Sequence, residues 1–167
     1  MSDQELFSLS ENSHSHLGDF SESKKIEAFV FQINERRFGI ELPYVQEVCI
    51  LKQLTPVPAV PPFIKGLVQL RRKILCVVDL PIFLDLPLNL SPLAQSYLLV
   101  LNYQNRELAL LIDQAEGIQS LALSSNREEG KGLLQEFIMA TTQDAILILD
   151  GKKFLKDARL LIGTHRQ

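Results

Sequence analysis

The residues best placed to bind a charged partner form a basic triplet, Arg71-Arg72-Lys73. The apolar runs on either side, residues 63–70 and 74–78, are short enough to be strands joined by a turn. The sequence therefore predicts a β-hairpin whose charged tip projects from a buried sheet. Such a tip either contacts a partner or is a solvated turn that protects its strands from aggregation.

Three aspartates, Asp79, Asp113 and Asp150, are candidates for acid–base or metal chemistry. Each follows an apolar run that ends there. Asp at the end of a strand usually accepts a hydrogen bond from the backbone of the following turn. We therefore favour a structural role for all three carboxylates.

Histidine and cysteine chemistry have little support. His14 and His16 could touch a metal, but no third ligand lies beside them, and a site needs three or four. Cys49 and Cys76 lie among apolar neighbours and are predicted to be reduced core residues. With no phosphate-binding loop or hydrolase motif in the chain, we expect no enzyme, no cofactor and no metal.

Several segments resemble the CheW family, whose members join bacterial chemoreceptors to the CheA histidine kinase. Residues 63–80 are similar to its Asn-Leu-Arg-Gly signature, and residues 45–48 to its Val-x-Glu-Ile element. Further similar segments follow in the family's order, over about residues 25–163: residues 55–58 and 62–66, residues 110–113 with 116–118, and residues 145–150.

The resemblance implies a mainly β fold of two small five-stranded Src-homology-like β-barrels packed together, with a short C-terminal helix. It also implies a non-enzymatic adaptor in a chemotaxis or pilus-motility array. Its partners would be the regulatory domain of a CheA-type histidine kinase and the cytoplasmic tip of a methyl-accepting chemoreceptor.

Position by position, the resemblance assigns receptor binding to Val45, Glu47 and Arg71, with Arg72 and Lys73 as possible accessory contacts. Alternatively, Glu47 and Arg71 pair with each other and only tie two segments together, an interaction worth under ~1 kcal/mol. Arg72 stands where the family has glycine, which leaves the turn geometry open. Cys76 replaces a frequent proline and only returns an N–H donor to the strand.

Alternating apolar residues predict two hairpins. Residues 29–42 read as one hairpin with a single buried face, and residues 97–112 as a second, covered on both faces. The order of hairpin, irregular segment, strand and closing Asp then recurs, with Asp79 and Asp150 in matching places. This recurrence fits two small barrels, but it does not show which strands the barrels exchange.

Helical signals are few. Single turns are expected over residues 43–47 and 81–86. A terminal helix is expected after Asp150-Gly151, where Leu155, Ala158, Leu161 and Ile162 recur at three and four residues.

The charges separate a tail from a body. Residues 1–24 hold five acids and seven serines against one lysine, so we expect a disordered tail followed by a CheW-like domain over residues 25–167. The body has 16 basic and 15 acidic residues, no run of ~20 apolar residues and no signal-peptide pattern before it. These features favour a cytoplasmic protein without membrane insertion.

The alternative function is a stand-alone nucleic-acid-binding barrel that uses Arg71, Arg72 and Lys73. Nucleic-acid barrels usually place aromatic residues among their basic groups for base stacking. No aromatic residue lies between Phe63 and Phe83, and the charge of the body is balanced, so we expect no nucleic-acid partner.

Overall fold

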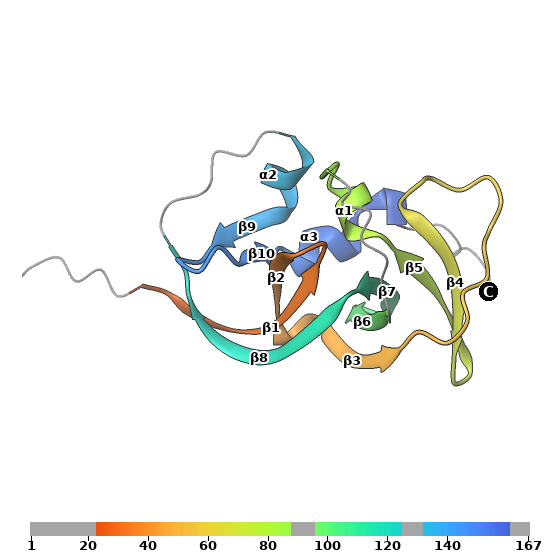
Figure 1. Ribbon diagram of the computed structural model, residues 1–167, viewed down its shortest axis with the longest axis horizontal. Helices are drawn as coiled ribbons and strands as arrows, with labels where there is room; N and C mark the ends of the chain where they lie inside the picture. The colour runs from red at the N-terminus through yellow and green to blue at the C-terminus, as the bar shows by residue number, and fades with distance from the viewer. Residues whose placement is uncertain (1–22, 88–95, 125–131, 161–167) are drawn as a thin grey trace, which may run out of the picture.

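The computed structural model describes residues 23–87, 96–124 and 132–160, and in these residues ten strands form two five-stranded sheets. The first sheet has the order β8 (Gln114–Ala122), β1 (Lys25–Ile33), β2 (Arg36–Glu41), β10 (Leu147–Leu149) and β9 (Ile138–Thr141). The second has the order β3 (Val45–Ile50), β6 (Tyr97–Tyr103), β7 (Arg106–Ile112), β5 (Lys73–Val78) and β4 (Ile64–Leu70). Figure 1 shows them as two adjoining lobes.

The two sheets have the same arrangement, and they exchange hairpins. The β1–β2 hairpin pairs with the C-terminal strands β8 and β10, whereas the β6–β7 hairpin pairs with β3 and β5 from the first half of the chain. In both sheets the exchanged hairpin pairs in parallel with a strand that an Asp follows, β5 before Asp79 and β10 before Asp150. The predicted recurrence of order is therefore present, with its halves interleaved.

Each sheet curls until its edges meet. An isolated bridge between Thr55 and Leu67 joins the segment after β3 to β4, with both backbone N–H···O distances at 2.8 Å. The equivalent bridge in the first sheet joins Leu123, just after β8, to Thr142, just after β9. The predicted pair of five-stranded barrels is confirmed, and we call them the first and second barrels.

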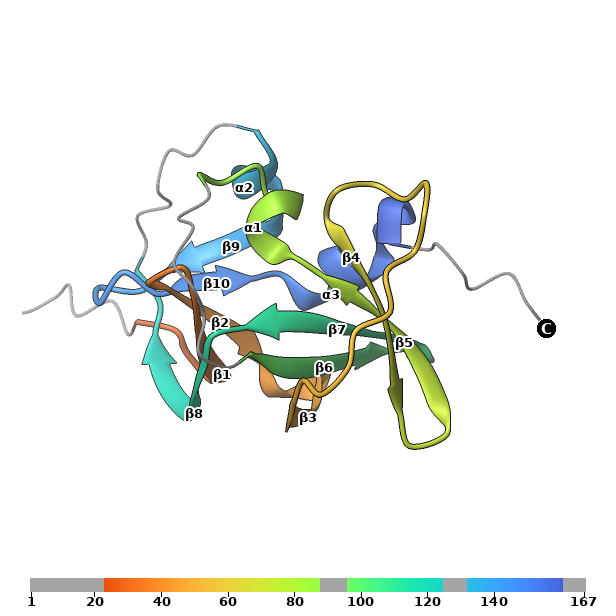
Figure 2. The same cartoon turned by 45° about the vertical axis from the view of Figure 1, so that its right-hand side comes forward.

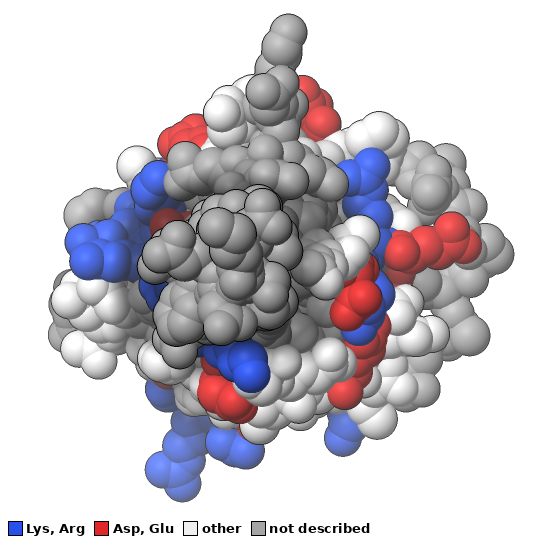
Figure 3. Space-filling view, turned by 90° about the vertical axis from the view of Figure 1, so that its left-hand side faces the viewer, with Lys and Arg blue, Asp and Glu red and all other residues white. Residues whose placement is uncertain are grey.

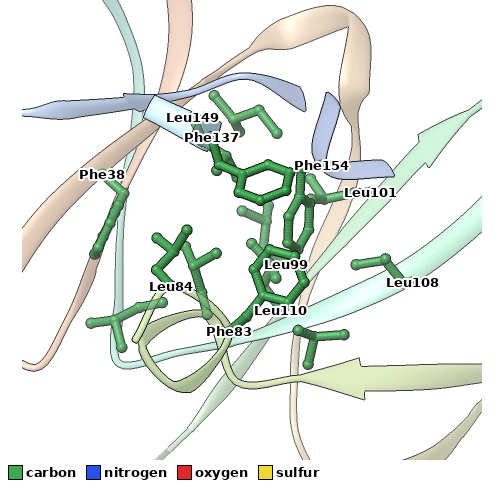
Figure 4. Close-up of a cluster of buried hydrophobic side chains, with 14 of the residues drawn as sticks. Phe38, Phe83, Leu84, Leu99, Leu101, Leu108, Leu110, Phe137, Leu149 and Phe154 are labelled. Carbon is green, nitrogen blue, oxygen red and sulfur yellow. The ribbon is translucent and has the colours of Figure 1, made fainter. Parts of the chain in front are cut away.

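The largest hydrophobic cluster lies between the barrels. It combines Phe38 and Leu149 of the first with Leu99 and Leu110 of the second, together with aromatic residues of the short helices (Figure 4). Two smaller clusters fill the barrel interiors, one around Val30 and Ile148 and the other around Val68, Leu75, Leu98 and Val100. Most strands are thus buried on both faces.

This burial corrects one prediction. Val30 and Phe31 point to opposite faces of β1, yet both are fully buried, so the first hairpin is covered on both sides. The second hairpin was expected to be covered on both faces, and it is.

Two of the three aspartates at strand ends cap helices, and the third joins two segments. Asp79 accepts a hydrogen bond from Ile82 N at 3.1 Å and begins α1 (Leu80–Phe83), and Asp150 accepts from Lys153 N at 3.0 Å and begins α3 (Gly151–Lys156). Asp113 accepts from Asn34 N at 2.7 Å and so ties the second barrel to the first hairpin. The predicted bond to the following turn is therefore present for Asp79 and Asp150, whereas Asp113 bonds the turn of a distant hairpin.

The helices are shorter than predicted. The first turn is a 3₁₀ helix at Leu42–Tyr44, after which the chain at once enters β3. The terminal helix ends at Lys156, and Ala158 belongs to a separate 3₁₀ turn, Ala158–Leu160. Residues 161–162 lie outside the described residues. A further helix, α2 (Leu133–Phe137), was not predicted.

Candidate interaction surface

The β4–β5 hairpin projects from the second barrel and carries the basic triplet at its end (Figure 2). Its last strand pair is Leu70 with Lys73, which leaves Arg71 and Arg72 as the turn. Val68 and Leu75 point into the barrel, whereas the side chain of Ile74 is on the outside and 71% exposed. The predicted charged tip is therefore present, with an exposed apolar residue beside it.

The turn of this hairpin differs from the other two. In the first and second predicted hairpins both turn residues, Asn34 with Glu35 and Gln104 with Asn105, have positive φ. At the basic tip only Arg71 does, with φ of 57°. The position where the family has glycine, Arg72, therefore does not use the left-handed region, and the unusual conformation falls one residue earlier.

Glu47 and Arg71 form an ion pair at the tip. Arg71 Nη2 lies 3.0 Å from Glu47 Oε2, with the arginine side chain 76% exposed and the glutamate 22%. The two residues come from β3 and the β4–β5 turn, which belong to opposite edges of one sheet. They meet because the sheet closes into a barrel. The alternative that these residues pair with each other is thus realised in the structure.

A second ion pair lies next to the first. Lys73 Nζ contacts both carboxylate oxygens of Glu107 at 2.7 and 2.9 Å, and Asn102 Nδ2 donates to Glu107 Oε1 at 3.0 Å. Sequence reasoning missed Glu107. The sequence places Glu107 at the start of a strand, just after the turn of the second hairpin. Only the pairing of β7 with β5 brings Glu107 close to Lys73.

The two ion pairs flank a hollow of about 350 Å³ at the barrel end, which we call the tip hollow. Its apolar floor includes Leu75 and Val100, which are 4% and 1% exposed and belong to the interior cluster of the second barrel. The other lining residues are Gln46, Glu47, Leu70, Arg71, Arg72, Lys73 and Glu107. A charged rim around an apolar floor can hold an apolar side chain of a partner while pairing its charges.

The structure brings four of the five predicted site residues to this hollow. Glu47, Arg71, Arg72 and Lys73 all line it. Val45 does not, because the β3–β6 register shifts between Val45 and Glu47 and the Val45 side chain packs against the cluster between the barrels. Arg72 is exposed and makes no ion pair with another described residue.

The strongest polar cluster of the first barrel serves its fold instead. Glu116 on β8 accepts hydrogen bonds from Arg37 Nε and Nη2 at 2.9 and 2.7 Å, and from Gln32 Nε2 at 2.7 Å. These donors, chiefly Arg37, lower the pKa of Glu116 to about 2. The cluster lies beside the irregularity at Val30/Phe31, where the register between β1 and β8 shifts, and it joins β8 to Gln32 of β1 and to Arg37 of β2.

The cysteines do not show the features of reactive thiols. Burial raises the pKa of both the Cys49 and the Cys76 thiol above the ordinary value. Cys76 packs against the cluster between the barrels and Cys49 against the interior of the second barrel. No group of three metal-ligating side chains occurs among the described residues. His14 and His16 lie outside them.

On the face shown in Figure 3, Lys and Arg side chains lie among Asp and Glu side chains. This mixture agrees with the balanced charge of residues 25–167. Within the part of the chain that the structure describes, no helix has the length and apolar character needed to cross a membrane.

Comparison with known proteins identifies the family. The model of the CheW-like domain matches residues 27–159. A chemotaxis protein CheW of Klebsiella aerogenes is 25% identical over 142 residues, covering 81% of this chain and 85% of that protein. The CheW of Thermotoga maritima is 23% identical over 147 residues, covering 84% and 95%.

A solved structure has the same fold. The scaffolding protein TtCheW from Thermoanaerobacter tengcongensis superimposes with a TM-score of 0.62 at 22% identity, over 75% of this chain and 89% of that one.

Proposed function

The chain belongs to the CheW-like domain family, and from this we propose that it is a non-enzymatic cytoplasmic adaptor that couples chemoreceptors to a CheA-type histidine kinase. The receptor's cytoplasmic tip binds at the tip hollow, and the regulatory domain of the kinase binds elsewhere on the barrels. The observation that carries the proposal is the convergence of Glu47 and Arg71, from two distant segments, on one exposed hollow with an apolar floor.

The geometry of the tip supports protein binding. Arg71 is three-quarters exposed although it is paired, so its guanidinium can donate to the oxygen of a second carboxylate or carbonyl while it keeps its contact with Glu47. Ile74 adds apolar surface beside the charged rim. Apolar surface with a nearby arginine is typical of the central residues of protein interfaces.

Nucleic-acid binding has less support from the same residues. Two of the three basic groups are paired with glutamates at 3.0 and 2.7 Å, so the tip carries little net positive charge for a polyanion. Only Arg72 is left without a counter-ion among the described residues, and no aromatic side chain lines the tip hollow. A groove for single-stranded nucleic acid needs several free cations and stacking rings.

Reversing the charge of Arg71 tests the proposal. We expect Arg71→Glu to weaken binding of a receptor-tip fragment by ~2–4 kcal/mol, a factor of about 30 to 1,000, because it leaves the receptor group unpaired and adds repulsion. The free energy of unfolding should change by less than ~1 kcal/mol, as for an exposed ion pair. Binding is measured by calorimetric titration and stability by urea unfolding.

The double variant Glu47→Arg/Arg71→Glu separates the two roles of Arg71. It restores an ion pair of reversed direction, so stability should return to that of the wild type. If Arg71 contacts the receptor, binding stays weak. If the double variant binds the receptor fragment with wild-type affinity, the ion pair has only a structural role. The tip is then not part of the binding surface.

A further inference from the structure

A second and larger hollow opens on the wall of the second barrel. It has a volume of about 750 Å³ and lies between β3 and β4, and we call it the seam hollow. Its apolar lining includes Val68 and Leu98, which are 6% and 1% exposed, and Ile50, which is 50% exposed. The lining residues are Cys49, Ile50, Lys52, Gln53, Thr55, Val68, Gln69, Leu70, Arg71 and Leu98.

The seam hollow selects for negative charge. Its two charged lining residues, Lys52 and Arg71, are both basic. Lys52 has no ion-pair partner among the described residues, and Arg71 shares its charge only with Glu47. An occupant therefore gains from carrying carboxylates next to its apolar side chains.

The seam also offers strand edges. Strands β3 and β4 are the two outer strands of their sheet, and the Thr55–Leu67 bridge is the contact that closes the barrel between them. An extended peptide can add to such an edge through backbone hydrogen bonds, with alternate side chains filling the hollow. The hollow is thus suited to an extended, acidic and partly apolar segment.

We propose that the seam hollow binds residues 3–11 of this same chain. This stretch carries Asp3, Glu5 and Glu11 around the apolar residues Leu6, Phe7 and Leu9, and no Lys or Arg precedes residue 24. The segment lies before the CheW-like domain, which is matched from residue 27. It therefore supplies negative charge that complements Lys52 and Arg71, and apolar side chains that match the apolar lining of the seam hollow.

The connection is long enough. Residues 12–23 span up to about 40 Å when extended, at ~3.3 Å per residue. A domain of this size has a radius of gyration of about 14 Å, so the extended linker is about as long as the body is wide. Tethering also gives an effective concentration in the millimolar range, at which even a weak contact is populated.

Docking of this segment would compete with receptor binding, an extension that rests on the proposed function. Arg71 lines both the seam hollow and the tip hollow, so an acidic residue that pairs with it hinders a second acidic partner. If residues 3–11 occupy the seam half of the time, replacing their apolar side chains should strengthen receptor binding about twofold.

Paramagnetic labelling of the full chain tests the docking without any receptor. A nitroxide is attached at Ser8→Cys in a chain in which Cys49 and Cys76 are replaced by Ser, and amide relaxation is measured by NMR. We expect strong broadening at residues 49–50 and 68–70 and little at β9. Lys52→Glu, or replacement of Leu6, Phe7 and Leu9 by Ser, should abolish it.

Two results would overturn the proposal. Uniform or absent broadening means that residues 3–11 do not bind the seam. Nitroxide-labelled chains can also be mixed with separate ¹⁵N-labelled chains. If broadening appears only in this mixture, the seam binds the segment of a second copy. If the broadening is seen but a receptor-tip fragment does not bind, the proposed receptor site and its competition with the segment are wrong. The docking of residues 3–11 is then still supported.

Discussion

The two barrels share one strand order but differ at one corner. In the first barrel the outer pair β9–β10 is short, four and three residues, with β10 buried and β9 half-buried. In the second, the matching pair β4–β5 has seven and six residues and extends beyond the body with the basic triplet at its end. The same arrangement of strands thus gives one closed barrel and one with an exposed hairpin.

The difference shows where stability and binding are placed. The first barrel uses its strongest polar cluster, Arg37 with Glu116, to join two strands. The second barrel places two of its ion pairs around a hollow, with cations that are 76% and 61% exposed. Exposed pairs contribute little to stability, so these charges are available to a partner.

The largest expected effect tests how the second barrel closes. A Cβ at Gly66 would lie 2.4 Å from Thr55 O, and the backbone there has φ of +150°. Gly66→Ala should therefore lower the free energy of unfolding by about 3 kcal/mol, combining a steric clash with backbone strain. Urea unfolding followed by circular dichroism measures it.

Gly117→Ala in the first barrel is the matched control. Gly117 also has positive φ, +95°, but a Cβ at this position would have no other atom within 4 Å. Only the strain remains, about 1 kcal/mol. Equal losses in the two variants would show that the approach of Thr55 does not decide how the second barrel closes.

The next effect distinguishes the ion pairs of the two barrels by pH. The folded-state pKa of Glu116 is about 2, below its ordinary value of 4.5, so its contribution is complete above pH 4.5 and is lost as the pH falls toward 2. Allowing for solvent screening, we expect this contribution to be about 1–2 kcal/mol. Glu116→Gln should therefore be less stable at pH 7 and lose less stability on acidification.

Glu47→Gln provides the comparison in the second barrel. Its partner Arg71 is largely exposed, so stability at pH 7 should stay within ~0.5 kcal/mol of the wild type. A loss as large as that of Glu116→Gln would contradict the assignment of the tip charges to binding.

A smaller effect concerns the hairpin turns. Glu35 has φ of 65° in a two-residue turn, where glycine is favoured. Glu35→Gly should therefore raise the free energy of unfolding by about 0.5–1 kcal/mol. Arg72→Gly should not stabilise, because the positive φ lies at Arg71. Thermal unfolding compares them. A gain for Arg72→Gly similar to that for Glu35→Gly would mean that the tip uses the turn of the first hairpin.

The smallest effect concerns residues 1–22, which lie outside the described residues. Deleting them should move the melting temperature by only a degree or two, because the described part of both barrels holds the core clusters. A loss of several degrees would mean that the segment forms part of a barrel.

Local patterns were enough to predict much of the fold. Alternating apolar residues located the hairpins at residues 29–42 and 97–112, and the basic triplet marked the tip of a third. The aspartates at the strand ends were assigned to turns, and Asp79 and Asp150 cap helices. The predicted terminal helix is too long, because the apolar stripe in the sequence continues past Asp157. In the structure the backbone becomes extended at Asp157.

The sequence by itself determined strands, turns and the presence of a charged tip, because these depend on neighbours within a few residues. Only the tertiary structure decided what the tip faces. Barrel closure brings β3 to the β4–β5 turn, and the pairing of β5 with β7 brings Glu107 to Lys73. The two contacts join residues that are 24 and 34 positions apart. Both depend on the β6–β7 hairpin, which lies between β3 and β5 in the second sheet. No local pattern encodes which hairpin enters which barrel.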